Sequence, residues 1–180
     1  MIRRVPSFYQ CCRGSAAVEM ALVTPMLLTL IFGSFELGNY FLDNHIVAKA
    51  VRDGARYAAR QSYSVYNCSS ITDSNVVTAI RNVVRTGQVT SGGSPRVPGW
   101  SDATTITVTV SCNSSFTTGI YSDITTTTGG TITAGAPVVT ISADVPYSSL
   151  FDFLFTGTRQ RVWGGNLAIH ARSQAPVTGV

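Results

Sequence analysis

Residues 13–40 read RGSAAVEMALVTPMLLTLIFGSFELGNY, and this stretch decides the architecture of the chain. Its centre, residues 20–35, carries no charge, and as an α-helix it would be ~24 Å long, slightly less than the ~30 Å hydrocarbon core of a bilayer. Residues 15–40 would reach ~39 Å, with Glu19 and Glu36 near the two ends. We therefore predict a transmembrane helix over residues 15–40.

The charges on either side of this helix predict its orientation. Residues 1–14 form a basic leader, no acid precedes Glu19, and the next cation after the apolar stretch is Lys49. The positive-inside rule then places the N-terminus in the cytoplasm and residues 41–180 outside it. A secretory signal peptide has a similar basic and apolar pattern, but no small-x-small cleavage site follows residue 35. An anchor is therefore preferred. The leader arginines are Arg3, Arg4 and Arg13.

Composition and motifs argue against an enzyme and against a nucleic-acid-binding protein. The 180 residues carry a formal charge of +4, but residues 15–180 contain 10 cations against 9 acids, so the basicity belongs mostly to the leader. No zinc-protease, hydrolase-elbow or phosphate-loop motif occurs, and the acids are scattered singly. We expect no catalytic residue, no cofactor and no metal site. His45 and His170 are expected to be surface or hydrogen-bonded residues rather than ligands, and Trp100, Tyr147 and Trp163 are expected in packing roles.

The residues around Gly14 form a more specific pattern. A short basic leader ends in Gly14, Glu19 stands five positions later, and an apolar helix follows, which resembles a prepilin processing site. More closely, the stretch is similar to the N-terminal signature of the TadE/TadG-like proteins, roughly R-G-x-A-A-V-E-F-A-L-x-x-P-x-x-L and then G-x-x-E-L-G. Met20 stands where that family usually has an aromatic residue, and the likeness continues to about residue 60. The matching residues are Arg13, Gly14, Ala16, Ala17, Val18, Glu19, Ala21, Leu22, Pro25, Leu28, Gly33, Glu36, Leu37 and Gly38.

This resemblance implies a function in pilus assembly. It implies a TadE-like minor pilin or pseudopilin of the Tad (Flp) type IVb pilus system, and hence adhesion and biofilm formation. The protein would be a single-pass protein of the bacterial inner membrane, with its C-terminal domain in the periplasm. A prepilin peptidase would cleave between Gly14 and Ser15, and Glu19, Pro25 and Glu36 would belong to the assembly helix.

The same resemblance implies partners and leaves one alternative open. The partners would be the major Flp pilin, other minor pilin-like proteins and the assembly platform. TadG-like relatives carry a large extra domain, whereas this chain is short, which favours a TadE-like role. The alternative is an uncleaved, single-pass, membrane-anchored module with a periplasmic binding or accessory role.

The periodicity beyond the membrane segment predicts an α+β domain. Helical spacing continues as an amphipathic helix and returns in a second helix that Thr72 or Asp73 begins and Gly87 ends. Alternation of apolar and polar residues predicts a three- to four-stranded antiparallel sheet, and Pro25 is expected to kink the first helix. The expected elements are helices over 44–60 and 73–86, strands over 104–110 and 138–145, a final strand from 161–163 and 166–173 with Leu167 on its apolar face, a short apolar element over 150–155 and a Thr/Gly-rich loop over 114–135.

The four cysteines divide between the two sides of the membrane. Cys11 and Cys12 lie in the leader, where a cytoplasmic location keeps thiols reduced. Cys68 and Cys112 lie in the external domain, where a disulfide is the default outcome. We therefore predict a disulfide between Cys68 and Cys112.

Overall fold

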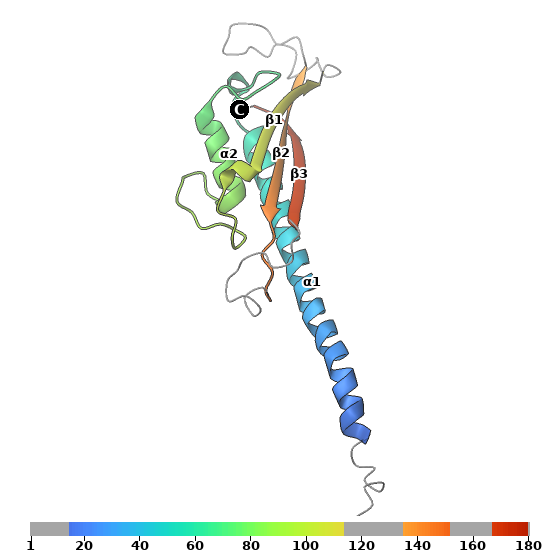
Figure 1. The fold of residues 1–180 in the computed structure, drawn as a ribbon. Helices are drawn as coiled ribbons and strands as arrows, with labels where there is room; N and C mark the ends of the chain where they lie inside the picture. The colour runs from blue at the N-terminus through green and yellow to red at the C-terminus, as the bar shows by residue number, and fades with distance from the viewer. Residues whose placement is uncertain (1–14, 114–134, 152–166, 180) are drawn as a thin grey trace, which may run out of the picture. The chain divides into compact units, whose positions relative to one another are not determined.

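The computed structural model describes residues 15–113, 135–151 and 167–179 (Figure 1). The predicted leader 1–14 and the loop 114–134 lie outside the described residues. So does the segment 152–166, which holds most of the predicted apolar element and the first part of the predicted final strand. The elements are α1 (Ser15–Ala59), α2 (Ser74–Thr86), β1 (Ile106–Asn113), β2 (Ala136–Pro146) and β3 (Ala168–Pro176), with short 3-10 turns at Tyr63–Val65 and Ala103–Thr105. The predicted α+β fold is confirmed.

The chain divides into two compact units, Met1–Gly38 and Asn39–Val180. Helix α1 contributes residues to both units. The predicted transmembrane helix and the predicted amphipathic helix after it are one continuous helix in the structure. Pro25 lies inside this helix. In the second unit, Val47, Ala50 and Val51 are fully buried, as their helical spacing predicts.

The three strands form one antiparallel sheet in the order β1-β2-β3. Alternate residues of β2 point into the core, and the register aligns apolar neighbours on the same face. Val139, for example, pairs with Val110 on β1 and with Ala175 on β3. The fully buried residues on β2 are Val139, Ile141, Ala143 and Val145.

The observed strands differ from the predicted ones at their ends. Thr104 belongs to a 3-10 turn rather than to β1, because its backbone N–H is held by the Asp102 carboxylate at 2.7 Å. Strand β3 extends to Pro176 because the ladder with β2 continues to the pair of Pro176 with Val138. Leu167, predicted on the apolar face of that strand, precedes it and is exposed.

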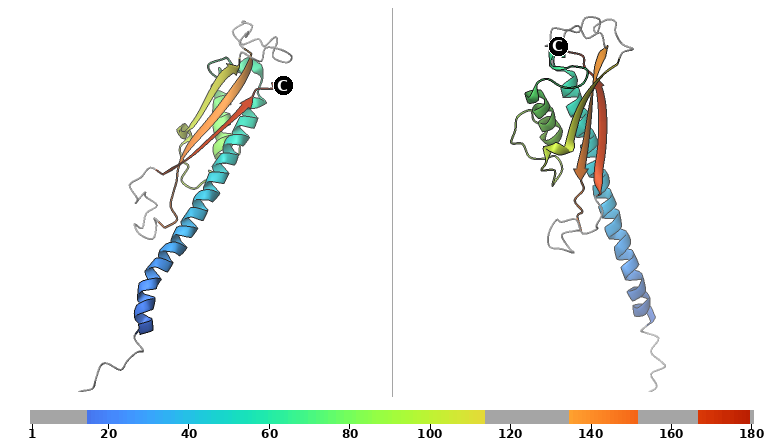
Figure 2. Two further views of the ribbon diagram at one scale, coloured as in Figure 1. Left: turned by 90° about the vertical axis from the view of Figure 1, so that its right-hand side faces the viewer. Right: turned by 45° about the horizontal axis from the view of Figure 1, so that its top comes forward.

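Both helices cover one face of the sheet. In the two views of Figure 2, α2 and the part of α1 after Asn39 lie on the same side of the three strands. Gly54 permits this close packing, since a Cβ at that position would lie 2.3 Å from Val84 Cγ2 and 3.3 Å from Ile141 Cδ1. The core therefore forms between the two helices and one face of the three-stranded sheet.

Two ordinary caps delimit α2. The Asp73 carboxylate accepts a hydrogen bond from the Asn75 N–H at 2.8 Å, so Asp73 rather than Thr72 is the N-cap. Gly87 ends the helix with a φ of 79°, a left-handed conformation that glycine adopts without steric cost. Both ends of the helix thus lie within a residue of those that the sequence predicts.

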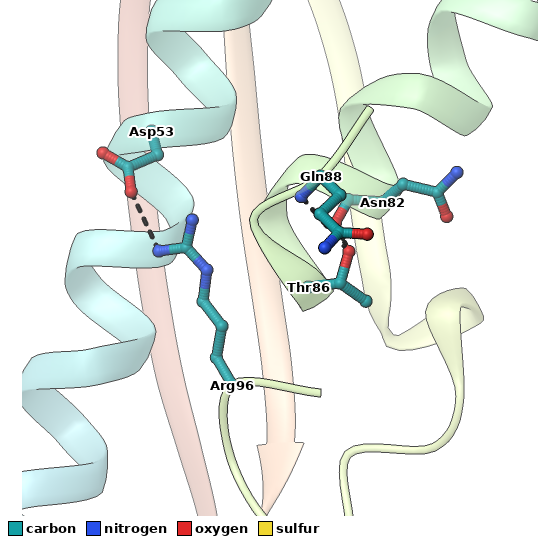
Figure 3. Close-up of polar contacts among 5 residues, drawn as sticks. All are labelled: Asp53, Asn82, Thr86, Gln88 and Arg96. Carbon is teal, nitrogen blue, oxygen red and sulfur yellow. Dashed lines mark hydrogen bonds and ion pairs between the residues drawn. The ribbon is translucent and has the colours of Figure 1, made fainter. Parts of the chain in front are cut away.

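Side chains attach the segment after α2 to both helices (Figure 3). Arg96 forms an ion pair with Asp53 of α1, with 2.8 Å between Nη1 and Oδ2. Asn82 donates a hydrogen bond to the Val89 carbonyl, and the Thr86 hydroxyl accepts one from the Gln88 N–H. These contacts are structural, since they hold a loop against the domain.

A disulfide joins Cys68 to Cys112, with 5.0 Å between the two Cα atoms. It links the turn after α1 to the end of β1. The Asn67 side chain shapes this turn by accepting a hydrogen bond from the Ser69 N–H. Nearby, Tyr66 is fully buried and donates its hydroxyl proton to the Ala58 carbonyl, and burial raises the pKa of this phenol.

Candidate functional site

The first part of α1 exposes an unusually apolar surface. From Val18 to Leu37 its large side chains are between 41% and 72% exposed, and no residue of the most apolar 18-residue window is buried. Soluble monomeric proteins rarely expose contiguous apolar patches larger than a few hundred Å². Among the described residues, α1 is the one helix that is long and apolar enough to cross a membrane. The exposed side chains are Val18, Met20, Leu22, Val23, Met26, Leu27, Leu28, Leu30, Ile31, Phe32, Phe35 and Leu37.

The hydroxyl groups in this segment are satisfied within the helix. Thr24, Thr29 and Ser34 each donate to the carbonyl four residues earlier, at 2.6, 2.8 and 2.7 Å. Such bonds suit an apolar environment, because no water is present there to satisfy a hydroxyl. Pro25 has no N–H to donate to the Ala21 carbonyl, so it marks a weak point in the helix. The segment thus contains few polar groups that need an external partner.

Ser15 and Glu19 are the predicted processing residues that the structure brings together. Ser15 is the first residue of α1, and its Oγ donates to Glu19 Oε1 at 3.2 Å, one helical turn away. Both residues are exposed. Gly14 lies outside the described residues. Pro25 and Glu36 lie on later turns of the same helix, and Glu36 is half-buried.

In residues 15–113, 135–151 and 167–179, no group of three or more His, Cys, Asp or Glu side chains is arranged to hold a metal ion. His45 is exposed, and His170 pairs with Asp144 on the exposed face of the sheet. Trp100 is fully buried and donates its indole N–H to Thr105 at 2.9 Å, so it has the packing role predicted.

The structure also reveals a cluster that the sequence analysis did not identify. Asn39 Nδ2 donates to the Tyr147 hydroxyl at 3.1 Å, and the rings of Tyr40 and Tyr147 meet edge to face at 5.3 Å. Tyr147 itself is buried. The sequence contains one signal for this cluster, since Tyr40 ends the apolar stretch and aromatic residues are enriched at membrane interfaces.

Asp43 lies one turn after this cluster, beyond the predicted span. Its side chain is buried, and this burial raises the pKa of the carboxyl above its usual value. A carboxyl buried at this point is unusual, since acidic residues are almost never fully buried unless they are paired.

Comparison with known proteins finds a family match for the N-terminal part of the chain. The family model described as TadE-like protein matches residues 14–56. Neither a curated protein nor a solved structure matches the chain. The matched range begins at Gly14 and includes both the exposed apolar part of α1 and the buried positions around Val51. The predicted resemblance is thus confirmed for residues 14–56, which match the TadE-like family.

Proposed function

We propose that this chain is a minor pilin-like, TadE-like subunit of a Tad (Flp) type IVb pilus system. Residues 15–40 anchor it in the bacterial inner membrane, with the leader in the cytoplasm and residues 41–180 in the periplasm. The protein serves assembly, and hence adhesion and biofilm formation, as a structural subunit and not as an enzyme. Its partners are a prepilin peptidase, the major Flp pilin, other minor pilin-like proteins and the assembly platform.

One observation carries this proposal. An exposed apolar helix of membrane-spanning length lies inside the segment that matches the TadE-like family. A helix of this kind has two stable surroundings, the bilayer and the packed helices of a filament, and a pilin-like subunit passes from the first to the second. The periplasmic domain would stay folded during this transfer, because its core lies after Asn39.

The proposed processing step exposes a new charge next to Glu19. Hydrolysis of the peptide bond between Gly14 and Ser15 removes the three leader arginines and leaves an α-amino group with a pKa of ~7.7–8.0, mostly protonated at neutral pH. Ser15 and Glu19 lie one helical turn apart, in direct contact through their side chains. In an assembled pilus, the Glu19 carboxylate of one subunit pairs with the terminal amine of its neighbour. This pairing offsets the cost of burying either charge alone.

Mass spectrometry of the membrane-extracted protein tests the cleavage. In cells with an active prepilin peptidase, the wild-type chain should begin at Ser15 and lack the mass of residues 1–14. Gly14→Leu should leave the precursor intact, because a large side chain obstructs a cleft that accepts glycine. A wild-type chain that begins at Met1 in these cells would contradict the cleavage.

Substitution of Glu19 separates processing from assembly. Glu19→Ala should still be inserted and at least partly cleaved, yet should not support piliation, because the terminal amine loses its partner. Normal piliation with Glu19→Ala would refute the pairing.

The alternative function is an uncleaved anchor for a periplasmic binding or accessory module. It shares the membrane topology but not the cleavage. A periplasm-dependent reporter at the C-terminus should be active in both cases, whereas the mass measurement distinguishes them. An inactive C-terminal reporter together with protease resistance of the domain in spheroplasts would overturn the topology itself.

A further inference from the structure

One end of the second unit gathers side chains from three separate parts of the chain. Asn39 and Tyr40 of α1 contact Tyr147, which follows the end of β2. The Tyr147 N–H donates to the Leu167 carbonyl at 3.0 Å, directly before β3 begins. Phe41 meets the ring of Tyr40, with 6.0 Å between the ring centroids. These contacts hold the start of the domain helix against the β2–β3 end of the sheet.

Large apolar side chains at this end are exposed. Phe41 is 55% exposed, Leu42 59%, Leu150 52% and Leu167 57%. We call these four residues the juxtamembrane surface. No charged residue occurs in the stretches 39–42, 145–150 and 167–169 that carry it. The nearest acid on α1, Asp43, is buried and does not contribute an exposed charge.

No spacer separates this surface from the apolar part of α1. The exposed apolar side chains extend to Leu37, and Asn39 already contacts the domain. The domain contact therefore begins two residues after the last exposed apolar side chain of the anchor. If residues 15–40 cross the bilayer, Tyr147 and Leu167 are held beside the point where the helix leaves the hydrocarbon core.

We propose that the juxtamembrane surface binds the headgroup region of the phospholipid bilayer, so that the periplasmic domain rests directly on the membrane. This inference depends on the membrane anchoring proposed above. Apolar side chains insert into the headgroup and acyl boundary, and aromatic rings with polar tips favour the same depth. Here the half-buried Tyr40 supplies such a ring, and the four exposed apolar residues supply the inserted surface.

Geometry favours lipid over a second protein chain as the occupant. Phe41 and Leu42 are consecutive in a helix, so their side chains diverge by about 100°. A protein partner would have to curve around the helix to cover both directions. Lipid molecules adapt to the protein surface, so they can contact Phe41, Leu42 and the exposed residues at the end of the sheet at the same time.

Depth measurements on the full chain test this inference. A Cys11→Ser/Cys12→Ser background leaves no free thiol, because Cys68 and Cys112 are bonded to each other. Single cysteines at Leu150→Cys and Leu167→Cys then carry a fluorescent label, and the protein is reconstituted at low density in phosphatidylethanolamine/phosphatidylglycerol vesicles. Both positions are more than half exposed, so the label does not disturb the core.

Two further labels serve as controls. Leu28→Cys reports the middle of the anchor. Arg60→Cys reports the far end of the domain, since the helical rise places this exposed residue about 30 Å along α1 from Asn39. We expect brominated lipids to quench the labels at Leu150 and Leu167 at a depth of ~5–10 Å, and the label at Leu28 more deeply. Aqueous iodide should quench only the label at Arg60.

The possible failures are distinguishable. If lipid quenches the label at Leu28 while iodide quenches those at Leu150 and Leu167, this inference is overturned and the anchor stands. If iodide also quenches the label at Leu28, the membrane anchoring fails as well. If the labels at Leu150 and Leu167 are shielded from both quenchers only at high protein density, a second copy of the chain covers the surface and the lipid assignment is wrong.

Discussion

Gly54 allows the most direct test of the packing in the unit Asn39–Val180. This residue lies inside α1, where alanine would normally favour a helix over glycine by about 1 kcal/mol. A Cβ at this position would nevertheless lie 2.3 Å from Val84 Cγ2 and 3.3 Å from Ile141 Cδ1. Gly54→Ala therefore sets helix propensity against core packing.

We expect the steric cost of Gly54→Ala in the core to exceed its gain in helix propensity. Val84 is fully buried and β-branched, so it has one strongly preferred rotamer in a helix and cannot rotate its Cγ2 away freely. An extra methyl group forced into a dense core costs about 1–3 kcal/mol. A 2.3 Å approach belongs near the upper end of this range. After the gain in helix propensity, we expect a net loss of about 1–2 kcal/mol in the free energy of unfolding.

Thermal unfolding of the detergent-solubilised chain, followed by near-UV circular dichroism, measures this loss. The midpoint should fall by roughly 2–8 °C for a domain of this size. Val84→Ala supplies the matched background, because it removes the side-chain atom that the new methyl group would meet. In that background, Gly54→Ala should be neutral or stabilising by up to about 1 kcal/mol.

Two outcomes would refute this reasoning. A stabilising Gly54→Ala in the otherwise wild-type chain would mean that α1 and α2 do not approach as closely as described. An equal cost in both backgrounds would mean that Val84 is not the obstacle. The coupling free energy between Gly54→Ala and Val84→Ala decides between these interpretations. We expect it to be about 2 kcal/mol.

Three further changes have expected outcomes. Cys68→Ser and Cys112→Ser should each lower stability by about 4 kcal/mol, since the bond closes a loop of sequence separation 44, and labelling of both thiols without reduction would contradict the bond. Burial raises the pKa of Asp43, so the folded state keeps its full stability below the unfolded-state pKa, where this carboxyl is protonated in both states. That stability is lost as pH rises through the folded-state pKa. Asp43→Asn should therefore raise stability at neutral pH and reduce this pH dependence in thermal melts, and an unchanged slope would contradict the burial. Asp53→Asn breaks a part-exposed ion pair with Arg96 and should cost less than about 1 kcal/mol, an effect that should shrink in 1 M salt.

Local sequence determined the elements whose signals are local. The apolar run, the helical spacing from Val47 to Ala58 and the caps at Asp73 and Gly87 are each encoded within a few turns of chain, and the structure has them where predicted. The TadE-like resemblance belongs to the same class, because it rests on one continuous stretch. The pairing of Cys68 with Cys112 required only the prediction that both residues lie on the same side of the membrane.

Contacts between distant segments required the tertiary structure. Asn39 and Tyr147 are 108 positions apart, and nothing in either neighbourhood indicates the other. The end of β3 depends on its register with β2, since pairing continues only as long as the partner strand supplies hydrogen bonds. Gly54 appears in the sequence as an ordinary weak point in a helix, and only the approach of Val84 explains the need for glycine there. Local propensity is a property of a few consecutive residues, whereas these features arise from which surfaces meet after the chain has folded.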